Sequence, residues 1–171
     1  MRGRAAVRPV TGALALGLFL VACRASRVDD GTFISTKGYQ VRIPREGWQI
    51  EPDGRPDLEL RRIAPPGGMV VDATCDSVQF DRSLDVLARH LTFGLRDRRT
   101  VESDTWTVGG RPATHRVVQG RRDGAEVTVE AVVLKGERCV HDFLYTAPSA
   151  EFESGRHDFR VLVESFAGDP S

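Results

Sequence analysis

The segment VESDTWTVGGRPATHRVVQGRRDGAEVTVEAVVLKGERCVHDFLYT, residues 101–146, predicts four consecutive β-strands. Apolar and polar residues alternate along its parts, which is the period of a half-buried strand. The parts are separated by Gly109-Gly110, by a polar loop rich in arginine and by Lys135-Gly136. Connections this short join antiparallel strands, because a parallel pair needs a crossover of about a dozen residues. We therefore expect an antiparallel meander.

Shorter strand patterns precede the meander. Tyr39, Val41 and Ile43 alternate with polar residues, and Pro44 ends that strand. Further extended segments are expected at residues 32–36, 47–50, 58–63 and 69–75. With the meander, these segments predict one long antiparallel sheet.

Two segments change to helical spacing. The first is marked by Leu84, Leu87, Leu91 and Leu95. Asp81 or Ser83 is expected to cap its first turn. The second follows Ser149, an expected cap, and its apolar side holds Phe152, Phe159, Leu162, Val163 and Phe166. Gly155 is expected to weaken its first half. The fold class is thus α+β, an antiparallel β-sheet flanked by two amphipathic helices, in a single domain over residues 32–168.

The first 22 residues have the three parts of an export signal, which are a basic start, an apolar run and a small residue before a cysteine. The apolar run is shorter than the roughly 20 residues that a membrane-crossing helix needs. We therefore interpret residues 1–22 as a signal peptide that is removed.

The end of this leader, Leu20-Val21-Ala22-Cys23, resembles the lipobox of bacterial lipoproteins. The resemblance implies that the bond between Ala22 and Cys23 is cut and that the thiol of Cys23 receives a diacylglyceryl group. Two or three acyl chains hold a protein durably on a membrane, whereas one chain holds it weakly. The polar residues that follow make 23–31 a lipidated tether. The partner implied by these residues is the membrane itself.

An ordinary secretory signal, cut after Ala25, is the alternative to a lipid anchor. For the lipoprotein, Arg24 stands where many Gram-negative lipoproteins carry an aspartate that resembles an inner-membrane retention signal. We therefore expect the periplasmic face of the outer membrane rather than the inner membrane.

Several turn and core residues follow an order that resembles a known superfamily. They are Gly38-Tyr39-x-Val41-x-Ile43-Pro44, Gly47-Trp48, Gly110-x-Pro112-Ala113, Phe143-x-Tyr145-x-Ala147 and Ser165-Phe166. Their order, with a helix in mid-chain and one at the end, resembles the PsbP/DcrB-like superfamily. The resemblance implies an antiparallel sheet flanked by helices and a non-catalytic role in supporting or binding larger assemblies. No metal-ligand set of its photosynthetic members can be transferred to positions in this sequence.

Composition is consistent with one domain and argues against nucleic acid as a partner. Removing 22 of the 171 residues leaves 149, which is the length of a single domain. The leader takes three arginines, so that 21 of the 24 basic residues remain against 24 acidic residues. A slight negative excess with interspersed arginines is not a nucleic-acid surface.

Cys75 and Cys139 remain after lipidation of Cys23, in a compartment that permits disulfides. Both are expected on the buried face of a strand. A bridge between them would stabilise the fold by about 4 kcal/mol in the chain-entropy model. The alternative is that Cys75 and Cys139 are two buried thiols too far apart to form a bond. The sequence does not decide between the disulfide and the free thiols.

No catalytic motif is present. A serine hydrolase would need a Gly-x-Ser-x-Gly elbow, and Ser154, His157 and Asp158 do not form one. A small periplasmic hydrolase assembled from scattered residues is therefore an alternative only. The sequence implies no cofactor, and we expect a membrane-anchored envelope protein with a non-catalytic binding or assembly role, whose partner is an envelope protein.

A metal-binding module is a further alternative. It would require His115, Cys139 and His141 to converge, since imidazole and thiolate suit zinc. The spacing of these residues matches no dedicated site, so no metal site is predicted. The carboxylates Asp53, Asp57 and Glu59 could attract a cation, or could form a solvated loop.

Overall fold

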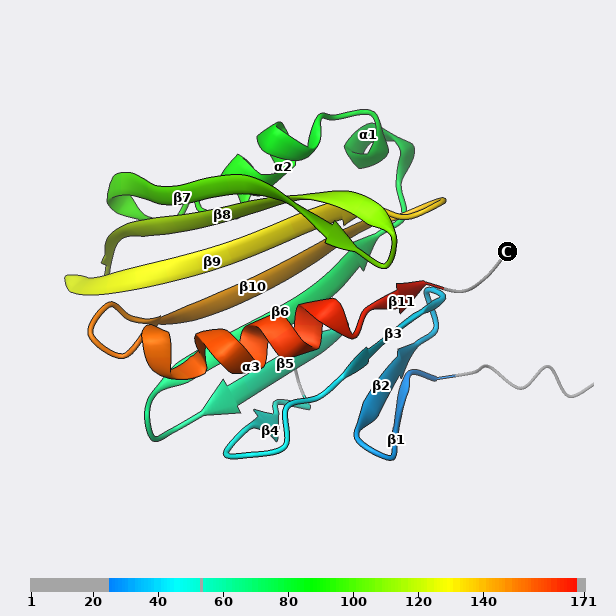
Figure 1. Ribbon diagram of the computed structural model, residues 1–171, viewed down its shortest axis with the longest axis horizontal. Helices are drawn as coiled ribbons and strands as arrows, with labels where there is room; N and C mark the ends of the chain where they lie inside the picture. Colours follow the sequence, from blue (N-terminus) through cyan, green and yellow to red (C-terminus); the bar gives the residue numbers. More distant parts are fainter. Residues whose placement is uncertain (1–24, 53, 169–171) are drawn as a thin grey trace, which may run out of the picture.

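The structure, a computed structural model, describes residues 25–52 and 54–168. Two antiparallel sheets and three helices occupy these residues (Figure 1). The predicted meander is present, because β7 to β10 follow one another along the chain and pair in that order. Ala22 and Cys23, where cleavage and lipidation are predicted, lie outside the described residues.

The larger sheet has seven strands in the order β4-β5-β6-β10-β9-β8-β7. Its strands are β4 (Gln49–Ile50), β5 (Leu58–Arg62), β6 (Gly67–Thr74), β7 (Arg96–Val108), β8 (Arg111–Arg122), β9 (Ala125–Lys135) and β10 (Val140–Pro148). Alternation sets which side chains face inward. On β10, for example, Phe143, Tyr145 and Ala147 are buried, as a strand with one face on a core requires.

A second, four-stranded sheet corrects the expectation of one long sheet. Its order is β1-β2-β3-β11, and its strands are β1 (Arg27–Asp29), β2 (Thr32–Ser35), β3 (Tyr39–Arg42) and β11 (Ala167–Gly168). The predicted strand alternation holds in β3, but its neighbour β11 comes from the other end of the chain. Residues 27–29, predicted to be tether, form β1 and pair with β2, so the folded part begins earlier than expected.

The helices cover both faces of the larger sheet. The helix α3 (Glu153–Glu164) lies on one face together with the smaller sheet, whereas α1 (Ser77–Phe80) and α2 (Leu84–His90) lie at the opposite face (Figure 1). Phe159 and Leu162 of α3 belong to the main core, and Leu87 of α2 packs on Val133 and its neighbours. Within the described residues, no helix is long and apolar enough to cross a bilayer.

The two predicted helices, α2 and α3, differ from the sequence prediction at their ends. The side chain of Ser83 caps α2 by accepting from the amide of Val86 at 3.4 Å, so Ser83 and not Asp81 is the cap. The helix ends at His90, so Leu95 lies beyond it, after a turn at residues 91–94. The N-cap position of α3 is Phe152 without a side-chain bond, because the Oγ of Ser149 accepts from Thr128 instead.

Cys75 and Cys139 are joined by a disulfide, which was one of the two alternatives that the sequence left open. The bond ties the end of β6 to the turn between β9 and β10. Cys139 is 6% exposed, as expected for a buried face. Cys75 is exposed, contrary to expectation, because β6 ends at Thr74 and the chain leaves the sheet there.

Candidate functional site

Three turns and both ends of the described chain gather at one end of the molecule. They are the β2–β3 turn at residues 36–38, the β7–β8 turn at 109–110 and the β9–β10 turn at 136–139 (Figure 1). We call this region the turn end. The chain enters the fold here, since the Oγ of Ser26 accepts a hydrogen bond from the amide of Thr36 at 3.2 Å.

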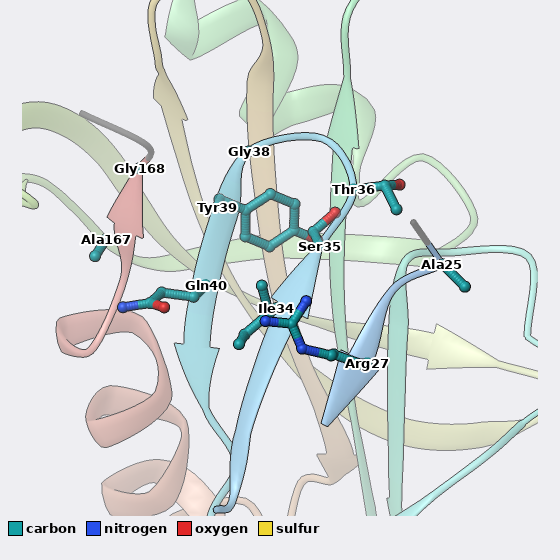
Figure 2. A pocket seen from close by; sticks show the side chains of 10 residues that line it. All are labelled: Ala25, Arg27, Ile34, Ser35, Thr36, Gly38, Tyr39, Gln40, Ala167 and Gly168. Atoms are coloured by element: carbon teal, nitrogen blue, oxygen red, sulfur yellow. The ribbon is translucent and has the colours of Figure 1, made fainter. Parts of the chain in front are cut away.

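The first cavity at the turn end has a volume of about 450 Å³ and lies over the smaller sheet (Figure 2). The register places Arg27 opposite Ile34, Ile34 opposite Gln40 and Gln40 opposite Ala167. Residues that face each other across strands share one side of a sheet, so these four form a row across its outer face. The row presents a cation, an amide and two apolar side chains to the first cavity.

Ala25 also lines the first cavity. It is the first described residue and lies two positions after Cys23. The cavity therefore lies beside the point where the chain arrives from the predicted lipidation site.

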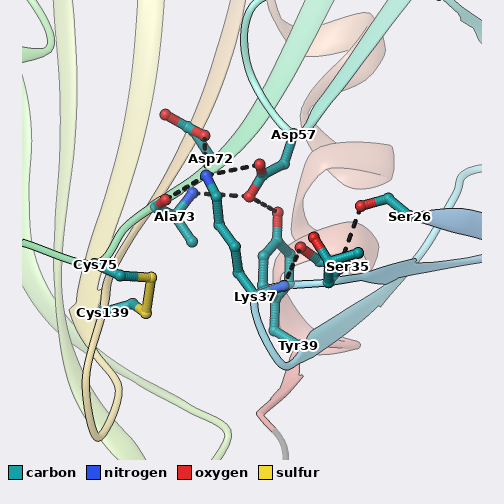
Figure 3. A network of polar contacts seen from close by, with 10 residues as sticks. Ser26, Ser35, Lys37, Tyr39, Asp57, Asp72, Ala73, Cys75 and Cys139 are labelled. Atoms are coloured by element: carbon teal, nitrogen blue, oxygen red, sulfur yellow. Dashed lines mark hydrogen bonds and ion pairs between the residues drawn. A yellow bond between two sulfur atoms is a disulfide. The ribbon is translucent and has the colours of Figure 1, made fainter. Parts of the chain in front are cut away.

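A network of polar contacts surrounds Lys37, which lies between Thr36 and Gly38 of the cavity lining (Figure 3). Its Nζ lies 2.7 Å from Oδ1 of Asp57 and 3.3 Å from Oδ1 of Asp72, and donates to the carbonyl of Ala73 at 2.5 Å. Burial alone would lower the pKa of Lys37, but the hydrogen bond and the charge of Asp57 raise it above the usual value. The ammonium group is therefore kept charged. Gly38, with φ of 80°, allows the tight turn that directs Lys37 toward these carboxylates.

Asp57 joins the two sheets. Its Oδ2 accepts from the hydroxyl of Tyr39 at 2.8 Å and from the amide of Ala73 at 3.2 Å (Figure 3). Burial, followed by the charge of Asp57, raises the pKa of Tyr39, so the hydroxyl stays protonated and continues to donate. Asp57, one of the carboxylates for which the sequence left a cation site or a solvated loop open, pairs with Lys37 of the same chain. Asp53 lies outside the described residues.

A buried polar cluster lies elsewhere, on the face of the larger sheet that α3 covers. The Nδ1 of His115 lies 2.5 Å from Oδ1 of Asp104, and its Nε2 lies 2.8 Å from Oε1 of Glu130. Trp106 stacks on the imidazole at 4.0 Å between ring centroids. Arg156 of α3 lies near the second oxygen of Glu130, at 3.4 Å. Glu130 and His115 are each 1% exposed, whereas the side chain of Asp104 is 60% exposed, so this ion network runs from the interior to the surface.

The cluster does not have the arrangement of a nucleophilic site. Both imidazole nitrogens of His115 face carboxylates, and within residues 25–52 and 54–168 no hydroxyl or thiol is hydrogen-bonded to them. Burial would lower the pKa of His115, whereas the hydrogen bonds of Glu130 and Asp104 raise it. On balance the pKa of His115 is raised, so these hydrogen bonds stabilise the protonated imidazole.

The zinc alternative is wrong for the residues that it named. The sulfur of Cys139 is bonded to Cys75 in the disulfide, and the imidazole of His115 is paired with Glu130. The imidazole of His141 packs against the rings of Tyr39 and Phe166, which also contact each other. In the part of the chain that the structure describes, no group of three His, Cys, Asp or Glu side chains is placed to hold a metal ion.

Comparisons with known proteins identify the fold. The sequence matches no protein-family model and no curated protein. Among solved structures, LpqN of Mycobacterium tuberculosis, described as involved in cell envelope biogenesis, matches 80% of this chain and 87% of its own, with a TM-score of 0.57 at 15% identity. PsbP of the cyanobacterium Synechocystis sp. PCC 6803 matches 94% of this chain and 99% of its own, also with a TM-score of 0.57 at 15% identity.

The yeast protein Mog1p, a Ran-binding protein of Saccharomyces cerevisiae, matches 77% of this chain and 90% of its own, with a TM-score of 0.50 at 14% identity. At these identities the likeness concerns the fold alone. The expected PsbP-like α+β fold is therefore confirmed.

Proposed function

We propose that this chain is a bacterial envelope lipoprotein with a non-catalytic binding role, anchored by acyl groups on Cys23. The observation that carries the proposal is the position of Ala25, which lines the first cavity only two residues after that cysteine. Two extended residues span at most about 7 Å. An acylated Cys23 would hold the turn end next to the lipid surface, with the first cavity at the boundary.

A binding role agrees with the chemistry of the first cavity. Its lining offers one cation, one amide and an apolar side chain, whereas the buried ion network around His115 lies on a different face and has no nucleophile. Neighbours with the same fold include a protein of envelope biogenesis and a Ran-binding protein, which supports the same class of role here. The partner we propose is another envelope protein, met at the periplasmic face of the outer membrane.

Metabolic labelling with an alkyne-tagged fatty acid tests the anchor. The wild-type chain should be labelled and should sediment with membranes, whereas Cys23→Ser should lose the label and become soluble. A double variant, Cys75→Ala with Cys139→Ala, controls for acylation of other cysteines and should keep the label. An unlabelled, soluble wild-type chain would refute the proposal.

A further inference from the structure

Two further cavities lie on either side of the turn at residues 91–94. The α2 cavity, of about 410 Å³, is lined by residues of α2, β7 and β8 and by Phe93. The β8–β9 cavity, of about 560 Å³, is lined by Gly94, the start of β7 and the turn between β8 and β9. That turn lies at the end of β8 opposite the β7–β8 turn, and so at the other end of the molecule from the turn end (Figure 1).

The two cavities are rich in arginine, and we call their combined lining the arginine surface. Each cavity contributes three arginines, namely Arg89, Arg98 and Arg116 for the α2 cavity and Arg96, Arg121 and Arg122 for the β8–β9 cavity. The lining also holds two carboxylates, Asp97 and Asp123. A surface with this excess of positive charge attracts an acidic partner.

Most of these arginines have no carboxylate partner of their own. Asp85 serves two of them at once, since it pairs with Arg89 at 3.1 Å and with Arg116 at 3.0 Å. The other four arginines of the surface form no ion pair with another residue in the described ranges. Their charge therefore remains available to a partner.

Strand pairing places some of this charge where it opposes folding. Arg96 of β7 lies directly opposite Arg121 of β8, and like charges in this position destabilise a sheet. The register of β7 also shifts between Arg96 and Arg99, where Asp97 has a φ of 50°. Such a bulge re-aims side chains, and here Arg96 lines one cavity and Arg98 the other. Local conflict of this kind is typical of functional surfaces.

Phe93 is a second and independent feature of the arginine surface. It is 63% exposed, yet its ring stacks on His90 at 5.1 Å between centroids and lies 5.2 Å from the guanidinium carbon of Arg98. The amide of Phe93 donates to the carbonyl of His90 at 3.1 Å, and that of Leu95 to the carbonyl of Thr92 at 3.2 Å. An aromatic side chain already held in place loses little entropy on binding, and such residues are common binding hot spots.

The α2 cavity is suited to an apolar side chain that is flanked by acidic ones. Val86 and Val118 line it beside Phe93 and provide an apolar lining. Guanidinium groups around this lining can form charge-assisted hydrogen bonds with carboxylates. Apolar lining with a few polar groups that fix orientation is the usual composition of a binding pocket.

We propose that the arginine surface docks an acidic segment of another envelope protein. An apolar side chain of that segment packs against Phe93 in the α2 cavity, and its carboxylates pair with Arg96, Arg98, Arg121 and Arg122. The choice of a protein over anionic lipid rests on the proposed function, because an anchor at Cys23 directs the turn end to the membrane and the β8–β9 cavity away from it.

A fluorescein-labelled peptide that alternates aspartate-glutamate pairs with phenylalanine tests the surface on the unacylated Cys23→Ser protein. Fluorescence anisotropy should show saturable binding that weakens as salt is added. The same peptide with asparagine and glutamine in place of its acidic residues should bind at least about tenfold more weakly. No saturable binding of the acidic peptide would overturn the proposal.

Variants in the same background locate the binding. Phe93→Ala and Arg98→Glu should each weaken peptide binding about tenfold, because one removes the aromatic anchor and the other reverses a charge beside it. The matched control is Arg45→Glu, which makes the same charge change at an exposed residue between β3 and β4 and should bind as the parent does. Equal affinity of the parent, Phe93→Ala and Arg98→Glu would overturn the site.

Melting temperatures separate a binding role from a structural one. Phe93 and Arg98 are exposed, so both variants should melt near the parent while binding the peptide more weakly. A loss of binding that is matched by a loss of folding would overturn the direct role of these side chains.

Vesicles distinguish a protein partner from a lipid surface. Flotation of the unacylated protein with phosphatidylglycerol vesicles should be no greater than that of Arg98→Glu. Flotation that is lost in Phe93→Ala and Arg98→Glu would assign the arginine surface to anionic lipid and overturn the protein partner. Because the protein used here has no anchor, neither result depends on whether Cys23 is acylated, which fatty-acid labelling tests separately.

Discussion

Asp142 lies on β10 with one buried carboxylate oxygen that has no hydrogen-bond partner among the described residues. Burial, with a contribution from the charge of Asp72, raises the pKa of Asp142 to about 7. The unfolded chain releases this proton near its ordinary pKa of 3.8. Between these values the folded state holds more protons than the unfolded state, so stability falls as pH rises from about 4 to about 7.

Replacing Asp142 by Asn should remove this loss of folding stability at higher pH. At pH 4 wild type and Asp142→Asn should unfold at similar urea concentrations, whereas at pH 8 the variant should be more stable by on the order of 2–4 kcal/mol. Urea unfolding at both pH values measures the difference. The exposed Asp123→Asn serves as control and should follow wild type. Parallel pH profiles for wild type and Asp142→Asn would show that this carboxyl does not titrate as described.

The residues of the buried ion network could be recognised in the sequence only in part. Glu130 stands in an apolar run of β9, and a carboxylate there needs a partner. Which partner it finds depends on strand register. The pairing of β7 with β8 places Asp104 opposite His115, and α3 then brings Arg156. Local sequence patterns do not encode such contacts, so His115 was grouped instead with Cys139 and His141.

At the scale of elements, α3 shows a conflict between helix propensity and packing. Glycine destabilises a helix interior by about 1 kcal/mol relative to alanine, and Gly155 was expected to weaken α3. The structure gives a reason for glycine at this position. A Cβ here would overlap the hydroxyl of Tyr145 and lie 2.8 Å from Nη2 of Arg62. Tyr145 and Arg62 are both buried, so neither can easily move.

Gly155→Ala should therefore destabilise the protein, by about 1–3 kcal/mol, although propensity alone predicts a gain. Thermal or urea unfolding measures the change. In a double-mutant cycle with Tyr145→Phe, part of the loss should be recovered, because the overlapping hydroxyl is gone. A stabilising Gly155→Ala would mean that the helix is not packed this closely on β10.

The larger elements were predictable because their signals are local. The alternation of apolar and polar residues and the short turns predict the meander from β7 to β10, and the spacing of the leucines predicts α2. The second sheet was not predictable in this way. Its pairing of β3 with β11 joins Gln40 to Ala167, and nothing in either short segment specifies a partner so distant in the chain. Helix ends were also missed, since Ser149 bonds to Thr128 rather than capping α3.

At the scale of the whole molecule, the disulfide cross-links two walls of the turn end. It closes a loop over a sequence separation of 64 residues, which limits the unfolded chain. Reduction should cost about 4 kcal/mol of stability in the chain-entropy model and lower the melting temperature by roughly 10 °C. Calorimetry with and without a reductant measures this shift.

The double variant Cys75→Ala with Cys139→Ala is the control for that experiment. It should melt near the reduced wild type and should not respond to the reductant. A wild-type melting temperature that is unchanged on complete reduction would show that the bridge contributes nothing to stability.

The turn end itself could not be predicted from the sequence. Lys37 and Arg138 belong to two separate turns and Arg111 begins β8, and only the common end of the strands makes them neighbours. The sequence could indicate Cys23 as the lipidation site and leave the pairing of Cys75 with Cys139 open. The sequence does not indicate that the chain enters the fold beside the first cavity, because that depends on β1 joining the smaller sheet.

The proposed acyl chains on Cys23 would hold the turn end against the membrane. Fluorescence quenching by brominated lipids tests it on the acylated protein in vesicles. A fluorophore on Thr36→Cys, at the turn end, should be strongly quenched, and one on Ala125→Cys, at the opposite end of β9, should not. Equal quenching at the two positions, or stronger quenching at residue 125, would contradict the claim.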